Sequence, residues 1–250
     1  MAPAKKLGRK AVVTDSRTAR LSRYFTKQLA PPPPARDWTK GITEWQMLMN
    51  DQLGDCTCAG IGHAVQVWSA NGSAEATVTD AEVLGIYESW CGYDPSDPST
   101  DEGGIELNVL KDFKAQGFAG HKLQAFASVL PATIAHVKQA INLFGGLYIG
   151  LEVPQFIMPA DGSDTPPVWD VTPAADNTII GGHCVYVTGY DATTFTFISW
   201  GTLWKMTTPF WTKFVDESYA LISPDFIAAN GLAPNGFRLA DLESDIVQIS

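Results

Sequence analysis

The sequence has no apolar run long enough to cross a membrane, because no segment approaches the roughly 18–20 uncharged residues that a spanning helix needs. Four cysteines in 250 residues are too few for a disulfide scaffold; they suit an intracellular chain, a catalytic thiol or a metal site. No internal repeat of solenoid or propeller length is visible. The charged fraction of 18% and the apolar fraction of 45% argue against wholesale disorder and indicate a folded chain with a sizeable core.

The N-terminal region lacks the apolar stretch of a secretion signal, so we expect a cytoplasmic or virion-associated protein. Residues 1–30 carry eight Lys or Arg side chains and one Asp, whereas the other 220 residues carry 9 basic and 26 acidic side chains. This basic arm is expected to contact nucleic acid or another acidic partner, an anionic surface, or the acidic body of the chain itself. The acidic body argues against nucleic acid as a partner of the globular part.

Four prolines at 31–34 predict a stiff spacer, so we assign residues 1–35 to an arm and spacer and residues 36–250 to one domain. Apolar periodicity predicts a helical half at about 55–143 and a β-rich half at about 144–250, which is an α+β arrangement. The helices are expected at 56–70, from 79, at 105–116 and at 131–143, with short pieces at 209–215 and 224–230. The strands are expected at 146–153, 184–190 and 194–200.

The segment Gly54-Asp55-Cys56 places a thiol at the start of the first predicted helix. Backbone N–H groups and the helix dipole stabilise a thiolate at such a position. Far along the chain, Gly182-His183 places an imidazole at the mouth of a predicted strand. A cysteine at a helix start with a distant histidine is the sequence pattern of a Cys–His nucleophilic pair.

Several segments resemble, in order, those of the papain-like cysteine peptidases. They are Asp37-Trp38, Gly54–Thr57, Phe144–Gly150, Gly182–Tyr190 and Ser199–Trp204. More closely, the turn Leu53–Thr57 resembles a bacterial or phage-type branch of that family. The resemblance implies a helical subdomain and an antiparallel β-barrel-like subdomain with a cleft between them. It also implies hydrolysis of a peptide or amide bond in a peptide or protein substrate, with no cofactor, metal or membrane.

The resemblance places Cys56 as the nucleophile, His183 as the base and Asn50 as the side chain that stabilises the oxyanion. Cys58 is an alternative nucleophile, because counting back from it by the same spacing reaches Gln52, the residue type of the family. If Cys58 is not the nucleophile, we expect it to be a small buried hydrophobic residue.

Two positions depart from the family pattern. Ile198 stands where the family has the asparagine that orients the histidine, so Ser199, a backbone carbonyl, Asp170 or Asp191 is expected to replace it. Asp55 places a carboxylate beside the nucleophile, where it opposes thiolate formation. Trp200 is expected to shield the imidazole, as the corresponding indole does in the family.

Three other interpretations stay open at this level. In the first, the chain is a catalytically weak or inactive papain-like binding or assembly module, for example in a phage particle or a bacterial complex. In the second, residues 1–30 are an inhibitory propeptide. A zinc site, less favoured because its spacing is uncommon, would use Cys56, Cys58, His63 and His183.

Overall fold

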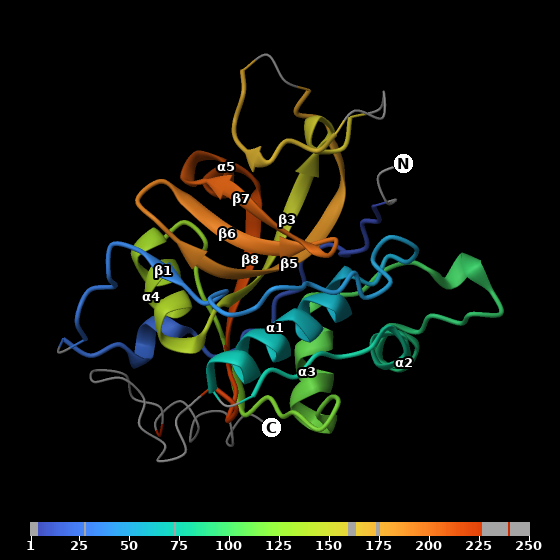
Figure 1. Cartoon of the computed structure of the whole chain (residues 1–250), viewed down its shortest axis with the longest axis horizontal. Helices are drawn as coiled ribbons and strands as arrows, with labels where there is room; N and C mark the ends of the chain where they lie inside the picture. Colours follow the sequence, from blue (N-terminus) through green and yellow to red (C-terminus); the bar gives the residue numbers. More distant parts are fainter. Residues whose placement is uncertain are drawn as a thin grey trace.

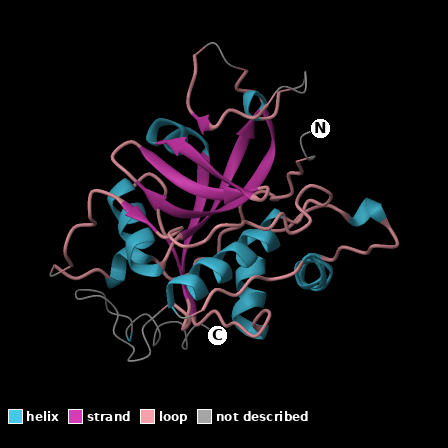
Figure 2. Cartoon of the chain, in the orientation of Figure 1, coloured by secondary structure: helices cyan, strands magenta, loops and turns pink. Residues whose placement is uncertain are grey.

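The computed structural model describes residues 5–27, 29–72, 74–159, 164–173, 176–226 and 240. In this part the chain forms a helical region and a mostly antiparallel sheet, as Figures 1 and 2 show. The helices are α1 (Cys56–Gly72), α2 (Asp80–Cys91), α3 (Glu106–Gln116), α4 (Ile134–Phe144) and α5 (Thr208–Phe214), with 3-10 turns at Leu21–Tyr24, Pro98–Thr100 and Gln155–Ile157. The strands are β1 (Arg36–Asp37), β2 (Ala125–Ser128), β3 (Leu147–Pro154), β4 (Val168–Trp169), β5 (Ile179–Tyr190), β6 (Thr194–Ser199), β7 (Thr202–Thr207) and β8 (Val215–Ile222).

The sheet has the order β2-β8-β3-β5-β6-β7-β4, and β1 pairs with β5. All pairings are antiparallel except that of β4 with β7. Helix α1 lies against β5, so the helical region meets the sheet close to its centre (Figure 1). This contact joins the two segments that carry the candidate nucleophile and the candidate base.

Local sequence signals set the helix ends. Helix α2 begins with a capping box in which Thr79 and Glu82 satisfy each other's backbone N–H groups, and it ends at Gly92 in the left-handed region. Helix α1 is buried along most of its length, and Gly60 allows it to approach the sheet, because a methyl group there would come 2.9 Å from the Tyr148 ring. Close packing of this kind fixes the position of the helix relative to the strands.

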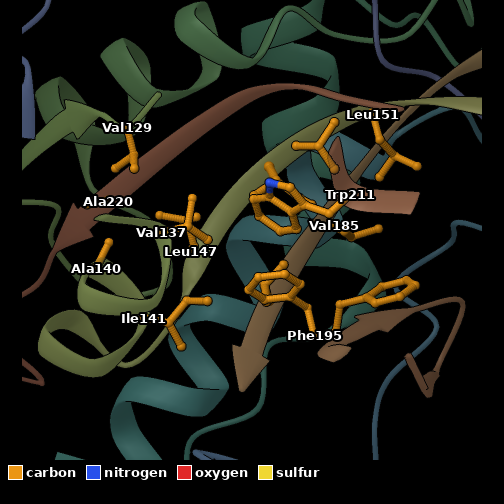
Figure 3. Close-up of a cluster of buried hydrophobic side chains, with 14 of the residues drawn as sticks. Val129, Val137, Ala140, Ile141, Leu147, Leu151, Val185, Phe195, Trp211 and Ala220 are labelled. Carbon is orange, nitrogen blue, oxygen red and sulfur yellow. The ribbon is translucent and has the colours of Figure 1, made fainter. Parts of the chain in front are cut away.

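The two faces of the sheet are both buried, which explains why its central strands are apolar at nearly every position. On one face, alternate residues of β3 and β5 join a core that α4 and α5 complete; Figure 3 shows part of this core, including Leu147, Val185 and Trp211. On the other face, strand residues that include Tyr148, Cys184 and Tyr186 form a second core together with residues of α1, α2 and α3.

Most expected elements are present, and the α+β class is confirmed. Helix α4 begins three residues later than expected, because Pro131 starts a turn. Helix α5 forms at the place expected from the sequence for a short helical piece on the outside, but it buries Phe210, Trp211 and Phe214. Strands β1, β2, β4, β7 and β8 were not expected. Of the piece expected at 224–230, residues 224–226 form a turn and the rest lies outside the described residues.

Among the described residues, no helix combines the length and apolar character needed to cross a bilayer.

Candidate active site

Cys56 is the first residue of α1 and is fully buried. The Asp55 carbonyl accepts hydrogen bonds from the N–H groups of Cys58 and Ala59, and Tyr148 of β3 donates its hydroxyl to the Thr57 carbonyl at 2.8 Å. The Cys56 sulfur accepts a hydrogen bond from the backbone N–H of Cys184 at 3.4 Å. The helix start is therefore held against β5 by contacts between residues far apart in sequence.

His183 lies on β5, one residue before the N–H that reaches the sulfur. Its Nε2 shares a hydrogen bond with Ser199 Oγ at 2.7 Å. The Trp200 indole stacks on the imidazole, with ring centroids 4.5 Å apart and an interplanar angle of 17°. The two side chains named from the sequence as a third member and a shield thus both contact the histidine.

The departure at Ile198 has a structural explanation. Ile198 is buried in the core beneath the helices, so its side chain belongs to packing. Asp170 accepts a bond from Thr207, and Asp191 accepts bonds from the β5–β6 turn, so the bonds of both carboxylates lie away from the imidazole. Of the side chains considered, Ser199 is the one that forms a hydrogen bond with His183.

The thiol and the imidazole are both shifted towards their neutral forms. Burial, with smaller effects of Asp55 and Glu106, raises the pKa of Cys56 to about 12. Burial, followed by the charges of Arg9 and His63, lowers the pKa of His183 to about 3. These directions are opposite to those of a thiolate–imidazolium pair and favour an uncharged thiol and an uncharged imidazole.

Asn50 and Asp55 form a buried pair beside the nucleophile. The Asn50 amide donates to Asp55 Oδ1 at 3.1 Å and to the Leu53 carbonyl at 3.3 Å. Burial raises the pKa of Asp55 to about 8, so its carboxyl is mainly protonated near neutrality and opposes a thiolate less than its charge would. Both amide hydrogens of Asn50 are engaged in this state.

The alternative nucleophile lies elsewhere. Cys58 is fully buried, and its sulfur is 3.9 Å from that of Cys91 at the end of α2. Gln52, which would accompany it, has an exposed side chain. Cys58 therefore packs as a small hydrophobic residue, which is what we expect of it if it is not the nucleophile.

The N-terminal arm covers the site. The Lys6 N–H donates to the Asn50 carbonyl at 3.1 Å, and the Trp200 indole N–H donates to the Lys6 carbonyl at 3.1 Å. The Lys5 ammonium lies over the rings of Trp200 and Trp204 and bonds to the Thr165 hydroxyl. These contacts hold the start of the arm against the residues that surround the imidazole.

The next residues of the arm cross the junction of the two halves. Arg9 donates its N–H to the Gly182 carbonyl at 3.0 Å, and Lys10 donates to the Gly104 carbonyl at 2.8 Å. Gly104 in turn donates to the Gly8 carbonyl at 2.8 Å, and the Gly8 N–H interacts with the Cys56 sulfur. Residues 5–10 therefore lie across the junction of the two halves, next to the Cys56 sulfur.

Glycines make this close approach possible. A methyl group at Gly8 would lie 1.7 Å from the Gly54 carbonyl oxygen, and one at Gly103 would lie 1.8 Å from the Gly8 oxygen. Contact of the arm with the body was one of the expectations from charge, but its place beside Cys56 was not predicted, although a glycine inside a basic arm and the pairs Gly103-Gly104 and Gly181-Gly182 were visible signals.

The residues considered for a zinc site do not converge. His63 Nε2 lies 2.9 Å from the Gln46 carbonyl oxygen, and Cys58 contacts Cys91 instead. Within the described ranges, no group of three or more His, Cys, Asp or Glu side chains could hold a metal ion.

Comparison with solved structures relates this fold to papain-like cysteine proteases. Xylellain, a cysteine protease from Xylella fastidiosa, is 17% identical and covers 89% of this chain and 98% of its own, with a TM-score of 0.54. A procathepsin B of Trypanosoma congolense is 11% identical, covers 87% and 86%, and has a TM-score of 0.60. A Carica candamarcensis cysteine protease in complex with E-64 is 13% identical, covers 76% and 98%, and has a TM-score of 0.52.

No protein-family model matches the sequence, and no curated protein matches it. The similarity is therefore one of fold, at low sequence identity.

Proposed function

We propose that this chain is a cysteine peptidase or amidase whose active site is covered at rest by its own residues 5–10. The observation that carries the proposal is the junction of α1 and β5. There the Cys56 sulfur accepts the N–H of Cys184, directly after a histidine that Ser199 orients and Trp200 covers. The papain-like fold supports the same reading.

The reaction is acyl transfer. Cys56 as thiolate attacks the carbonyl carbon of a peptide or amide, and the developing oxyanion accepts hydrogen bonds from the Cys56 backbone N–H and from the Asn50 amide. Asn50 serves this role when it gives up one of its present bonds. His183 takes the thiol proton and passes it to the leaving amine, and water then releases the acyl group from sulfur.

Displacement of the arm favours the ionised pair. Water then reaches the thiol and the imidazole, which removes the burial that raises the pKa of Cys56 and lowers that of His183. Removal of the Arg9 charge acts on His183 in the same direction. The neutral pair is thus a property of the covered state.

The test is covalent labelling by the epoxysuccinyl inhibitor E-64, followed by mass spectrometry of the intact chain and its peptides. We expect slow labelling of the wild-type chain and faster labelling of the Gly8→Ala chain, in which the arm no longer fits. Cys56→Ser in the Gly8→Ala chain is expected to abolish the adduct, and Cys58→Ser is expected to retain it. An adduct that persists in the Cys56→Ser chain would refute the assignment of the nucleophile.

A second function, that of an inactive papain-like module, is favoured by the buried neutral thiol and by Ile198. It predicts that iodoacetamide alkylates Cys56 in the Gly8→Ala chain only as the pH approaches that of an ordinary thiol, about 8.5. The peptidase predicts alkylation of Cys56 already near pH 5. The pH profile of this one cysteine therefore separates the two functions.

A further inference from the structure

Arg9 carries its side chain away from the backbone of the arm and into an acidic pocket of the body. Its Nη2 lies 2.8 Å from Asp216 Oδ2 and its Nη1 lies 3.4 Å from Glu217 Oε2, both on β8. Glu106, the first residue of α3, also faces the guanidinium and raises its pKa together with the other two carboxylates, although burial opposes the charge. The Arg9 side chain is only 3% exposed.

The pocket has the shape of the side chain that fills it. A methyl group at Gly150 of β3 would come within 2.6 Å of Glu106 Oε1 and 2.7 Å of Arg9 Cδ, so only a glycine leaves room for both. Glu217 is held in place because Tyr219 donates its hydroxyl to Oε1 at 2.6 Å, which turns Oε2 towards the guanidinium. The two Nη atoms of the guanidinium thus reach two different carboxylates, which uses two donors of the planar head group of arginine.

The acids of the pocket outnumber the bases. Glu106 is 1% exposed, and neither of its carboxylate oxygens has a hydrogen-bond partner of normal geometry among the described residues. Burial, with the charge of Glu217, raises the pKa of Glu106 well above its usual range. Among the described residues, Arg9 is the cationic side chain that pairs with Asp216 and Glu217, and its charge also acts on Glu106. A pocket that loses Arg9 keeps the carboxylate of Glu217 buried and that of Asp216 partly exposed, and these two groups favour another cation.

We propose that the pocket formed by Glu106, Asp216 and Glu217 around Gly150 binds an arginine side chain of a peptide ligand, and that Arg9 occupies it in the resting chain. The ligand becomes a substrate only if the proposed function holds, because the backbone that carries this arginine passes the Cys56 sulfur one residue away, at Gly8. Asp216 and Glu217 also line a groove of about 600 Å³ whose other side is formed by residues that include Val12 and Leu21.

The test measures peptide binding to the full chain carrying Gly8→Ala, Arg9→Ala and Cys56→Ser, which empties the pocket and prevents turnover. The probes are an end-blocked peptide with the sequence of residues 5–10 and the same peptide with citrulline, a neutral isostere, in place of arginine. Isothermal titration calorimetry is expected to give an affinity about 10- to 100-fold lower for the citrulline peptide.

Pocket variants in this background identify the site. Gly150→Ala, which fills the pocket, and Glu217→Gln, which keeps the acceptor for Tyr219, are each expected to remove most of the preference for arginine. Glu102→Gln is the matched control, because it makes the same charge change at a surface carboxylate that pairs with Lys10 at 3.2 Å. It is expected to leave the preference intact.

Equal affinities for the two peptides, or a preference that survives both pocket substitutions, would overturn the proposal. If neither the Arg9→Ala chain nor an Arg9→Gln chain folds cooperatively, Arg9 is a structural counterion of the core and the proposal is wrong. Binding needs no chemistry, so the two proposals fail separately. Arginine preference without an E-64 adduct removes the peptidase, and an adduct without arginine preference removes the pocket.

Discussion

Gly8→Ala tests whether the arm controls access to the nucleophile. The new methyl group would lie 1.7 Å from the Gly54 oxygen and 2.2 Å from its carbonyl carbon, far inside any normal contact. One side of this contact must move. The Gly54 turn is anchored, since its N–H donates to Asp101 at 2.9 Å and Asp101 also accepts the hydroxyl of Tyr87. The arm makes several hydrogen bonds of its own, but we expect the arm to move and the turn to stay, because the turn leads directly into the buried helix α1.

The size of the effect follows from the cost of overpacking, about 1–3 kcal/mol for an added methyl group that its surroundings cannot absorb. If the covered state is destabilised by about 2 kcal/mol, the open fraction rises about 30-fold, because 1.4 kcal/mol is a tenfold change in an equilibrium constant. The alkylation rate of Cys56 follows this fraction as long as the arm opens and closes faster than the reagent reacts.

The assay is the rate of iodoacetamide modification of Cys56, read from the peptide that contains it. Gly85→Ala is the matched control, because Gly85 lies on the exposed side of α2 with no atom within 4 Å of an added methyl group. It is expected to alkylate like wild type. Equal Cys56 rates in Gly8→Ala, Gly85→Ala and wild type, with the same denaturation midpoint, would refute the reasoning that the arm limits access.

Two further predictions concern the titrating groups. Burial raises the pKa of Asp55 in the folded state to about 8, so this carboxyl makes the free energy of unfolding fall as the pH rises from about 4 to 8, by at most about 1.4 kcal/mol per pH unit. Asp55→Asn is expected to flatten this pH dependence, measured by urea denaturation at several pH values. An unchanged pH dependence in the variant would contradict the prediction. Trp200→Ala exposes the imidazole of His183 and is expected to raise the pKa of His183 from about 3 towards 6.5, measured by NMR titration. Trp200→Phe keeps an aromatic ring over the imidazole and is expected to raise this pKa less. Equal pKa values in the two variants would show that the stacked ring does not control the burial of His183.

Local signals account for the parts of the site that the sequence predicted. The glycine turn before Cys56 and the helix that follows depend on neighbouring residues, and so does the strand that carries His183. The sequence named four candidate partners for the imidazole of His183 and could not choose among them. The fold places one of these, the Ser199 hydroxyl, 2.7 Å from Nε2 of His183. Likewise, only the fold shows that the Cys56 sulfur meets the N–H of Cys184 on β5, whereas the Cys58 sulfur lies beside Cys91.

The sequence by itself determined the α+β order of elements, the buried centre of the sheet and the segments that carry the thiol and the imidazole, because caps and apolar periodicity act over a few residues. Only the tertiary structure decided that residues 5–10 lie over Cys56 and that Arg9 enters the pocket of Asp216 and Glu217, more than 200 positions away. Such contacts depend on shape and on the exclusion of water between distant segments. Their strength comes from burial, which no local pattern encodes.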